Sequence, residues 1–312
     1  MKLSEMKQLL AEHGIQLTKS LGQNFLHDAH QLRRIVAAAQ LSRSDQVLEI
    51  GPGLGPLTEL LVAEAGEVLA IEKDARLARV LKVGQASRLS PSEAGQPPGL
   101  SPSGTAAKAG TGETPVGCGG TGGTPVLRLM TGDALEFLRR ERRDWSEWKL
   151  VANLPYSVAS RIVVELAQAE RGPQRMVVTL QLEVARRLMA GAGDPDYGAL
   201  TLLVQLNYEP TGFFKVPGSC FFPEPDVDSA CVRLIRRPQP LLAPPEKGIF
   251  QRVVKRSFSQ RRKMMMKLLK EDWPAEELAG VFEQLHLSRQ TRAEDVSLEK
   301  FVKLTEALAR QD

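Results

Sequence analysis

Asn153, Pro155 and Tyr156 form a short segment whose residue types suit chemistry on the exocyclic amine of adenine. That amine is a poor nucleophile because its lone pair is delocalised into the ring. The carboxamide oxygen of Asn153 and a nearby backbone carbonyl can each accept one N–H bond, which favours a pyramidal nitrogen aimed at a methyl donor. Pro155 stiffens the backbone, and Tyr156 offers a face for a splayed-out base to stack on. We expect these three residues to be catalytic, although an Asn-x-Pro segment also commonly makes turns.

A glycine-rich loop lies upstream, with Gly51, Gly53 and Gly55 following a short apolar run that ends in Glu49 and Ile50. Glycines between a strand and a helix allow a ligand to approach the backbone closely. The dinucleotide fingerprint would need a further glycine where this chain has proline. Alternate glycines after an acidic strand residue instead resemble the motif of S-adenosylmethionine methyltransferases. A simple turn is the alternative for the loop taken alone.

Two carboxylates end the next two predicted strands. Glu72 lies about 20 residues beyond the glycine loop, where an acidic side chain bonds a ribose diol. Asp133 ends the third strand and is placed to accept a hydrogen bond from an adenine amine. Taken alone, each could simply be a carboxylate that faces solvent at the end of a strand. Their placement together with the glycine loop favours a cofactor site.

The proposed chemistry needs no metal, because the sulfonium of the cofactor already activates the methyl group and positioning supplies most of the catalysis. The sequence agrees, since its cysteines and histidines show no metal-ligand spacing. Cys118, Cys220 and Cys231 also form no CxxC pair. We therefore expect no structural metal, and free thiols suited to a reducing cytoplasm.

The elements that must position these residues alternate between strand and helix. A helix should begin at Pro56, which suits a first turn. The alternation predicts an α/β fold with a Rossmann-like, doubly wound sheet. In such a sheet the loops after the first and fourth strands flank the point where the strand order reverses, and ligands bind there. The predicted strands are residues 46–50, 67–72, 126–130, 149–152, 176–180, 202–206 and 230–235.

Composition divides the chain into three parts. Residues 1–44 indicate a basic, partly helical N-terminal arm, and residues 45–237 the catalytic domain. A proline-rich linker then leads into residues 238–312, whose sequence pattern has a helical period. Within the catalytic domain, residues 84–125 are rich in Gly, Ser, Thr and Pro, with crude internal repeats. We expect a disordered insert there, because so few large apolar residues cannot offset the entropy of ordering.

Charge is mildly basic overall, with a net charge of +4 and a pI near 9.0. Its distribution is uneven, since residues 251–270 carry eight Lys or Arg and no acid. A charge run is usually a solvated face, but a dense cluster of one sign repels itself without a polyanion. We therefore expect phosphate binding by RNA. The RNA-binding candidates are Arg252, Lys255, Arg256, Arg261, Arg262 and Lys263.

No targeting segment is evident. The first residues lack the apolar stretch of a signal peptide, and no run of about 18 apolar residues occurs. A hydrophobic content of 42% is ordinary for a soluble globular protein. We expect a cytoplasmic protein with no membrane partner, monomeric when free.

With these residues in place, the sequence resembles the ribosomal RNA adenine dimethyltransferase family, and specifically its bacterial small-subunit branch. The resemblance implies transfer of methyl groups from S-adenosylmethionine to N6 of two adjacent adenosines. These lie in a hairpin near the 3′ end of small-subunit (16S) RNA and become dimethyladenosines. It also implies an immature ribosomal subunit as partner and a late role in subunit assembly. The supporting stretches are residues 20–26, 51–55, 71–74, 132–135, 153–156, 222–229 and 258–263.

Matched positions extend the list of site residues. The resemblance assigns cofactor contacts to Asn24 and Leu26, which composition alone does not indicate. It also assigns base positioning to Asn153 and Tyr156. The complete set of predicted cofactor contacts is Asn24, Leu26, Gly51, Gly53, Glu72, Asp133 and Asn153.

The chain departs from the family pattern at two places. Ala152 precedes the catalytic segment where glycine or an acid is more usual, and Met264, Met265 and Met266 replace a more polar stretch after Lys263. Three other functions stay open at this point. One is the macrolide-resistance branch, which methylates one adenosine of large-subunit RNA. The others are a DNA adenine methyltransferase and a non-catalytic ribosome assembly factor.

Overall fold

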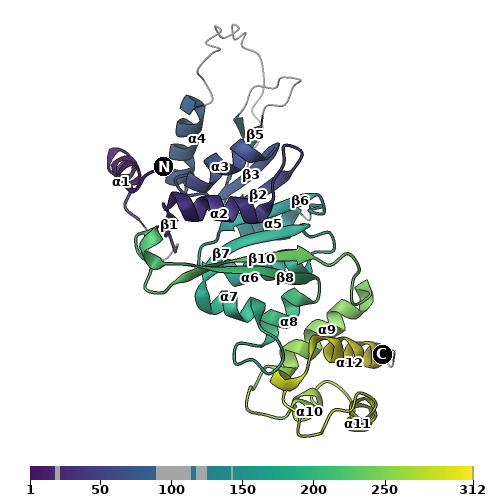
Figure 1. The fold of residues 1–312 in the computed structure, drawn as a ribbon. Coiled ribbons are helices and arrows are strands. Elements are labelled where there is room, and N and C mark those ends of the chain that lie inside the picture. The colour runs from purple at the N-terminus through teal and green to yellow at the C-terminus, as the bar shows by residue number, and fades with distance from the viewer. Residues whose placement is uncertain (18–21, 89–113, 117–124, 142, 311–312) are drawn as a thin grey trace.

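The computed structural model describes residues 1–17, 22–88, 114–116, 125–141 and 143–310. Strands and helices are interspersed as far as β10, and the described chain then ends in helices (Figure 1). The helices are α1 (Leu3–Glu12), α2 (Ala29–Ala39), α3 (Pro56–Glu64), α4 (Ala75–Arg88), α5 (Ala134–Glu141), α6 (Ala159–Gln168), α7 (Leu182–Met189), α8 (Ala199–Gln205), α9 (Pro244–Ser257), α10 (Met265–Leu269), α11 (Ala275–Gln284) and α12 (Leu298–Ala309).

A single large sheet organises the catalytic part of the molecule. Within the described ranges it has eight strands in the order β4-β5-β3-β2-β6-β7-β10-β8, parallel from β5 to β7 and antiparallel at both edges. The strand order reverses between β2 and β6, as the sequence predicts. The strands are β1 (Phe25–Leu26), β2 (Gln46–Ile50), β3 (Glu67–Glu72), β4 (Thr114–Val116), β5 (Val126–Thr131), β6 (Trp148–Asn153), β7 (Arg175–Gln181), β8 (Tyr208–Val216), β9 (Phe221–Phe222) and β10 (Ser229–Arg236).

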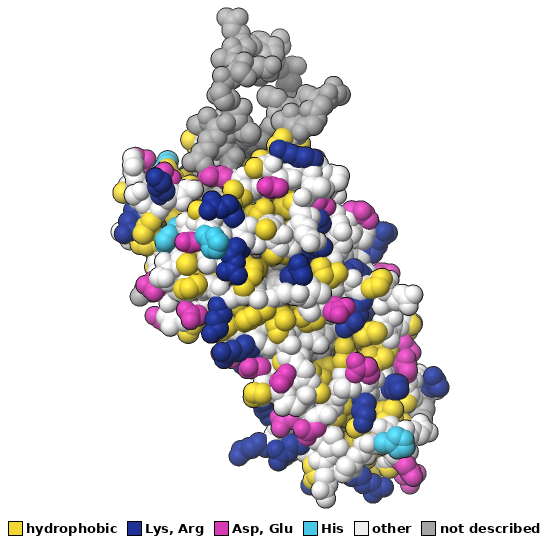
Figure 2. Space-filling model, viewed as in Figure 1, with side chains coloured by type: hydrophobic (Ala, Val, Ile, Leu, Met, Phe, Trp, Pro, Cys, Tyr) yellow, Lys and Arg dark blue, Asp and Glu magenta, His cyan; other side chains and the backbone are white. Residues whose placement is uncertain are grey.

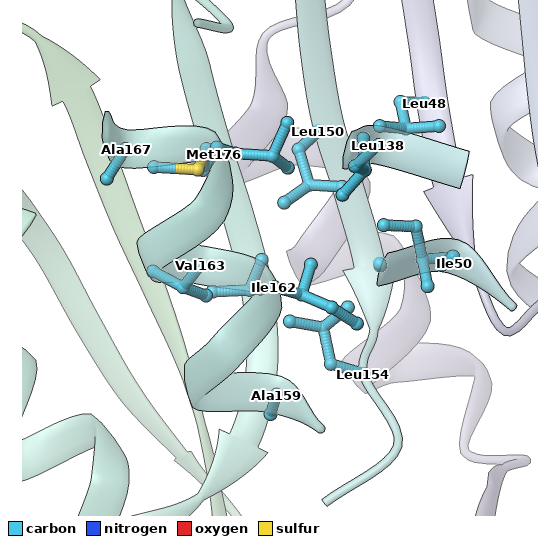
Figure 3. Packing of buried hydrophobic residues seen from close by; sticks show 14 of the residues in the cluster. Leu48, Ile50, Leu138, Leu150, Leu154, Ala159, Ile162, Val163, Ala167 and Met176 are labelled. Carbon is cyan, nitrogen blue, oxygen red and sulfur yellow. The ribbon is translucent and has the colours of Figure 1, made fainter. Parts of the chain in front are cut away.

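Helices cover both faces of this sheet, which explains why its central strands are apolar runs rather than alternating ones. On one face α2, α3 and α4 pack against residues such as Val47 and Val177. On the other face α5, α6 and α7 pack against residues such as Leu150. Figure 3 shows this second layer, with Ile162 of α6 directed toward the side chains of the sheet. The result is the Rossmann-like, doubly wound fold that the sequence predicts.

Part of the N-terminal segment, predicted as an arm over residues 1–44, packs into the catalytic domain. Leu32, Ile35 and Val36 of α2 are buried against the sheet, so this helix belongs to the catalytic unit. The short strand β1 pairs with β9 in a separate two-stranded sheet, which ties the segment to residues almost 200 positions later. That pairing fixes the chain just before α2, beside the cavity described below.

Parts of the segment expected to be disordered have regular structure. Helix α4 continues to Arg88, and Thr114–Val116 forms β4, which pairs antiparallel with β5. The rest of residues 84–125, apart from Pro125 itself, lies outside the described residues.

One predicted strand is wrong. Residues 202–206 lie in and just after α8, and the edge strand follows as β8. Leu202 and Leu206 are buried in the core of the C-terminal helices, whereas Val204 is buried against the sheet core. A helix buried on both sides has no polar face, so its apolar run resembles that of a buried strand.

The C-terminal helices α9 to α12 lie at one end of the molecule, beyond α7 and α8 (Figure 1). They share a hydrophobic core that also contains Leu202 and Leu206 from the α8 region, so this core extends across the boundary expected at residue 238. No strand occurs after β10 in the described residues, in agreement with the helical period of the sequence. None of the described helices is long and apolar enough to cross a membrane.

Candidate active site

One cavity opens at the carboxyl ends of β2, β3, β5 and β6, where the sheet reverses its strand order. Its walls are the loops that follow these strands together with the chain around β1. Residues far apart in the sequence therefore converge on one crevice, as the doubly wound topology requires. All of the predicted catalytic and cofactor residues line it: Asn24, Leu26, Gly51, Gly53, Glu72, Asp133, Asn153, Pro155 and Tyr156.

The glycine loop has a backbone that other residues would strain. Gly51 and Gly53 have φ angles of +72° and +60°, in the left-handed region that glycine adopts without cost. A Cβ on Gly51 would lie 3.2 Å from the ring of Pro155, and one on Gly53 only 2.5 Å from the ring of Phe25. The bare backbone thus lets the loop after β2 approach both the catalytic segment and the β1 region, and it exposes main-chain groups to the cavity.

Glu72 is a buried carboxylate that organises the loop opposite. Its Oε2 accepts a hydrogen bond from the Gly53 amide at 3.0 Å, and its Oε1 accepts one from the Asp74 amide at 2.8 Å. Burial raises the pKa of Glu72, while these two amides lower it in part. Each oxygen keeps a second lone pair that can accept from a hydroxyl. The geometry fits the ribose diol expected from the sequence.

Asp133 is held between a helix and a lysine. Its Oδ1 accepts from the backbone amides of Leu135 and Glu136, so it caps α5. Its Oδ2 accepts from Lys73 Nζ at 3.0 Å, and this contact, more than any other, holds its pKa below the usual range. Asp133 is therefore an ionised acceptor at the edge of the cavity, with lone pairs remaining for an adenine amine.

Asn153 is oriented by the chain around β1. Its Nδ2 donates to the backbone carbonyl of Asn24 at 2.9 Å. Its Oδ1 is buried and accepts no hydrogen bond from any described residue. A buried polar atom without a partner is costly and calls for an explanation. Asn153 lines the cavity, and because its nitrogen is engaged by Asn24, the oxygen is the acceptor that remains for an adenine N–H.

Tyr156 is anchored at its far end. Its hydroxyl hydrogen-bonds the hydroxyl of Ser229, the first residue of β10. Burial raises the pKa of Tyr156, so its phenol is neutral and can take part in that bond as a donor. The bond restrains the tilt of the ring whose face is expected to meet the base. Sequence reasoning missed Ser229, because no local pattern links it to a residue 73 positions earlier.

The six basic candidates do not share one environment. Three are engaged within the protein. The guanidinium of Arg256 pairs with Glu271 and Asp272, and that of Arg261 pairs with Glu294. Arg252 lies over the ring of Trp273, 4.4 Å from its centroid.

Lys255, Arg262 and Lys263 are exposed and make no ion pair with any described residue. Over the C-terminal helices, at the lower end of the view, Figure 2 shows side chains of both signs. Residues 251–270 contain no acid, but acids from the segments that follow α10 reach Arg256 and Arg261 in three dimensions.

The described residues contain no group of three or more His, Cys, Asp or Glu side chains arranged to hold a metal. The donors around the cavity are instead backbone groups, carboxylates and an amide, which match the hydroxyls and amines of an adenosyl group. The residues present thus fit S-adenosylmethionine.

Comparison with known proteins decides the family. The model of the ribosomal RNA adenine dimethylase family matches residues 14–90 and 123–310. The chain belongs to this family. It is 37% identical to the Ribosomal RNA small subunit methyltransferase A of Geobacillus kaustophilus, over 97% of this chain and 94% of that protein. The protein of the same name from Latilactobacillus sakei is 32% identical, over 98% and 94%.

Solved structures show the same fold. The structure of the 23S rRNA methyltransferase ErmE aligns with 92% of this chain and over 100% of its own length, with a TM-score of 0.63 and 26% sequence identity. The structure of a dimethyladenosine transferase from Plasmodium falciparum aligns with 92% of this chain and over 98% of its own length, with a TM-score of 0.70 and 23% sequence identity. As a member of the adenine dimethylase family with a Rossmann-like methyltransferase fold, the protein is an enzyme that methylates rRNA, and S-adenosylmethionine is its methyl donor.

Proposed function

We propose that the protein transfers methyl groups to N6 of two adjacent adenosines in a hairpin near the 3′ end of small-subunit rRNA, giving N6,N6-dimethyladenosines. Its substrate is the RNA of an immature small subunit, and the modification is a late step in assembly. The protein works in the cytoplasm, as a monomer when free and without a metal. The shared name of the relatives at 37% and 32% identity supports the choice of the small subunit.

The observation that carries the proposal is the free Oδ1 of Asn153 in the cavity of the glycine loop. The bond from its Nδ2 to Asn24 fixes which end of the amide faces the cavity. An adenine amine that donates to this oxygen, and to a backbone carbonyl of the rigid segment at Pro155, turns its lone pair away from the ring plane. The ring of Tyr156 provides the stacking surface for the extruded base.

The cofactor contacts follow from the same cavity. Glu72 would bind the ribose hydroxyls, Asp133 the adenine amine, and the bare backbone at Gly51 and Gly53 the remainder of the ligand. Asn24 and Leu26 close the cavity from the β1 side. When bound, S-adenosylmethionine supplies an electrophilic methyl group on a sulfonium. The protein's task is alignment of the amine with that group, which is worth several orders of magnitude in rate.

Binding of the RNA backbone rests on exposed charge in α9 and in the loop between α9 and α10. Lys255, Arg262 and Lys263 are the strongest candidates, because their charges have no acidic partner among the described residues. Arg252, Arg256 and Arg261 would instead shape the surface that carries them. Phosphate contacts of this kind position the RNA without reading its sequence.

A second candidate is a large-subunit adenosine, favoured by the likeness to ErmE at 26% identity. Primer extension on ribosomal RNA separates the two, because dimethyladenosine blocks reverse transcription. RNA from a strain lacking the gene should lose a stop at two neighbouring adenosines of the small-subunit RNA and regain it on complementation. Loss of a stop in large-subunit RNA alone would reject the proposal.

A non-catalytic assembly factor makes a different prediction in the same strain. Complementation with a catalytically inactive Asn153→Ala gene would then restore subunit assembly as well as the wild-type gene does. The oriented Asn153 amide and the glycine loop around it argue for an active enzyme.

A further inference from the structure

Glu49 is a second buried carboxyl group in the wall of the cofactor cavity, beside Glu72. It lies near the end of β2, just before the glycine loop, and is only 1% exposed. Its Oε2 accepts no hydrogen bond from any described residue. The proposed roles of the catalytic and cofactor residues make no use of it.

The surroundings of Glu49 disfavour a negative charge. Burial is the dominant effect and raises its pKa to about 8, the Thr58 side chain of α3 lowers it in part, and the Glu72 carboxylate raises it again. From β3, Glu72 is the charged group that acts on it. From α2 and α3 the same cavity is lined by the apolar side chains of Leu32 and Leu57. A carboxyl group in such a site favours its protonated form, because the contact with Thr58 replaces only part of the water that would solvate its anion.

The ligand of this cavity is a cation. At neutral pH S-adenosylmethionine carries a sulfonium, an ammonium and a carboxylate, hence one net positive charge. In a cavity of low dielectric a cation stabilises nearby carboxylates far more than it does in water. Binding of S-adenosylmethionine therefore shifts the protonation equilibrium of Glu49 toward the carboxylate.

We propose that Glu49 is a proton-linked cofactor residue, which is protonated in the free enzyme and releases its proton when S-adenosylmethionine binds. The inference rests on the methyl donor alone and holds whichever ribosomal adenosine is the substrate. It gives the enzyme a means of distinguishing the methyl donor from its demethylated product by charge.

The reaction itself reverses the effect. Methyl transfer breaks the S–C bond, leaves both electrons on sulfur and forms an N–C bond from the amine lone pair, while the nitrogen loses one proton to solvent. The sulfonium becomes a neutral thioether, so S-adenosylhomocysteine has no net charge. Glu49 then regains a proton from solvent, which weakens the binding of the product relative to that of the donor.

Isothermal titration calorimetry at pH 7 in buffers of different ionisation enthalpy counts the protons released on binding. Wild type should release more protons with S-adenosylmethionine than with S-adenosylhomocysteine. Both ligands carry the same amino-acid group, so the difference excludes its own ionisation. Equal proton counts for the two ligands would overturn the proposal, and this arm needs no variant.

Glu49→Gln removes the titrating proton and retains the shape of the side chain. It should abolish the difference between the ligands, and the exposed Glu64→Gln on α3 should preserve it. In wild type the affinity for S-adenosylmethionine should rise as the pH is raised toward about 8. The rise should be at most about tenfold per pH unit. In Glu49→Gln the same affinity should depend less steeply on pH. An unchanged proton count in a folded Glu49→Gln protein would assign the effect to another group and reject the proposal.

Discussion

The side-chain amide of Asn153 donates a hydrogen bond to the backbone carbonyl of Asn24 over 2.9 Å, and so joins two segments 129 residues apart. This bond decides the orientation of the catalytic amide, because its nitrogen is engaged and its oxygen is left for the substrate. The carbonyl belongs to the main chain immediately before β1, whose pairing with β9 holds it in place. The N-terminal segment thus takes part in the chemistry by aligning Asn153.

Replacing Asn153 with alanine should reduce methyl transfer at least about a thousandfold, because both the acceptor and its alignment are lost. Cofactor binding should fall much less. Incorporation of labelled methyl into RNA and calorimetric affinity for the cofactor measure the two effects separately. The matched variant is Asn24→Ala, which keeps the carbonyl that orients Asn153. It should weaken cofactor binding but retain turnover at saturating cofactor, and undiminished turnover of Asn153→Ala would exclude the mechanism.

Glu72→Gln should weaken cofactor binding by roughly 10- to 100-fold, since a hydrogen bond to a charged group is worth about 1.5–3 kcal/mol. The glutamine retains one acceptor for the Gly53 or Asp74 amide, so the fold should survive. Calorimetry with the cofactor tests the affinity, and circular dichroism tests the fold. An affinity equal to that of wild type would remove Glu72 from the binding site.

Gly53→Ala should abolish cofactor binding and lower the melting temperature. Its φ of +60° and the 2.5 Å approach of a new Cβ to Phe25 force the loop to move. Gly280→Ala in α11 is the contrasting change, because a Cβ there has no heavy atom within 4 Å. Alanine inside a helix is favoured over glycine by up to about 1 kcal/mol, so this variant should be slightly more stable and fully active. A stable, cofactor-binding Gly53→Ala would show that the loop is not confined.

Basic residues of α9 and of the loop between α9 and α10 should divide into two groups. The triple change of Lys255, Arg262 and Lys263 to alanine should reduce the slope of log K against log salt for RNA by about 2–3, because each removed cation leaves one phosphate with its counterions. Arg256→Ala should leave that slope nearly unchanged and lower the melting temperature, because it strands Glu271 and Asp272. Equal slopes for wild type and the triple variant would reject the assignment.

Folding stability should depend on pH through Glu49. Its pKa rises from 4.5 to about 8 on folding, so between these values the unfolded chain binds fewer protons than the native one and stability falls as pH rises. Glu49→Gln lacks this loss. Its stability advantage over wild type should grow through that window, to on the order of a few kcal/mol, and stay constant above it. Denaturant titrations at several pH values measure it, and a difference that stays constant from about pH 5 to about pH 8 would contradict the burial of a neutral acid.

Much of the sheet could be predicted from the sequence, because its central strands are short apolar runs that end at glycine or an acid. The positions of the loops that follow β2 and β6 can be predicted from the alternation of strands and helices, because the carboxyl ends of parallel strands lie at the same edge of the sheet. The α8 region could not be assigned in the same way. Leu202 and Val204 are buried in different cores, so the apolar run has neither helical nor strand periodicity.

The contacts that complete the site were beyond the sequence for a different reason. Ser229 meets Tyr156 only through the sheet, and Glu294 meets Arg261 only through the fold of the C-terminal helices. Neither pair has a local signature. Residue types therefore indicate which chemistry is available, whereas the tertiary structure decides which charges remain free to act.

The most direct test of the central claim is mass spectrometry of RNA after the protein is incubated with S-adenosylmethionine and immature small ribosomal subunits. This measurement reports the base, its position and the number of methyl groups together. The account predicts two neighbouring adenosines of the small-subunit RNA, each gaining a pair of methyl groups on N6, as expected when one site positions an amine twice. Methylation of another base, or of large-subunit RNA only, would contradict it.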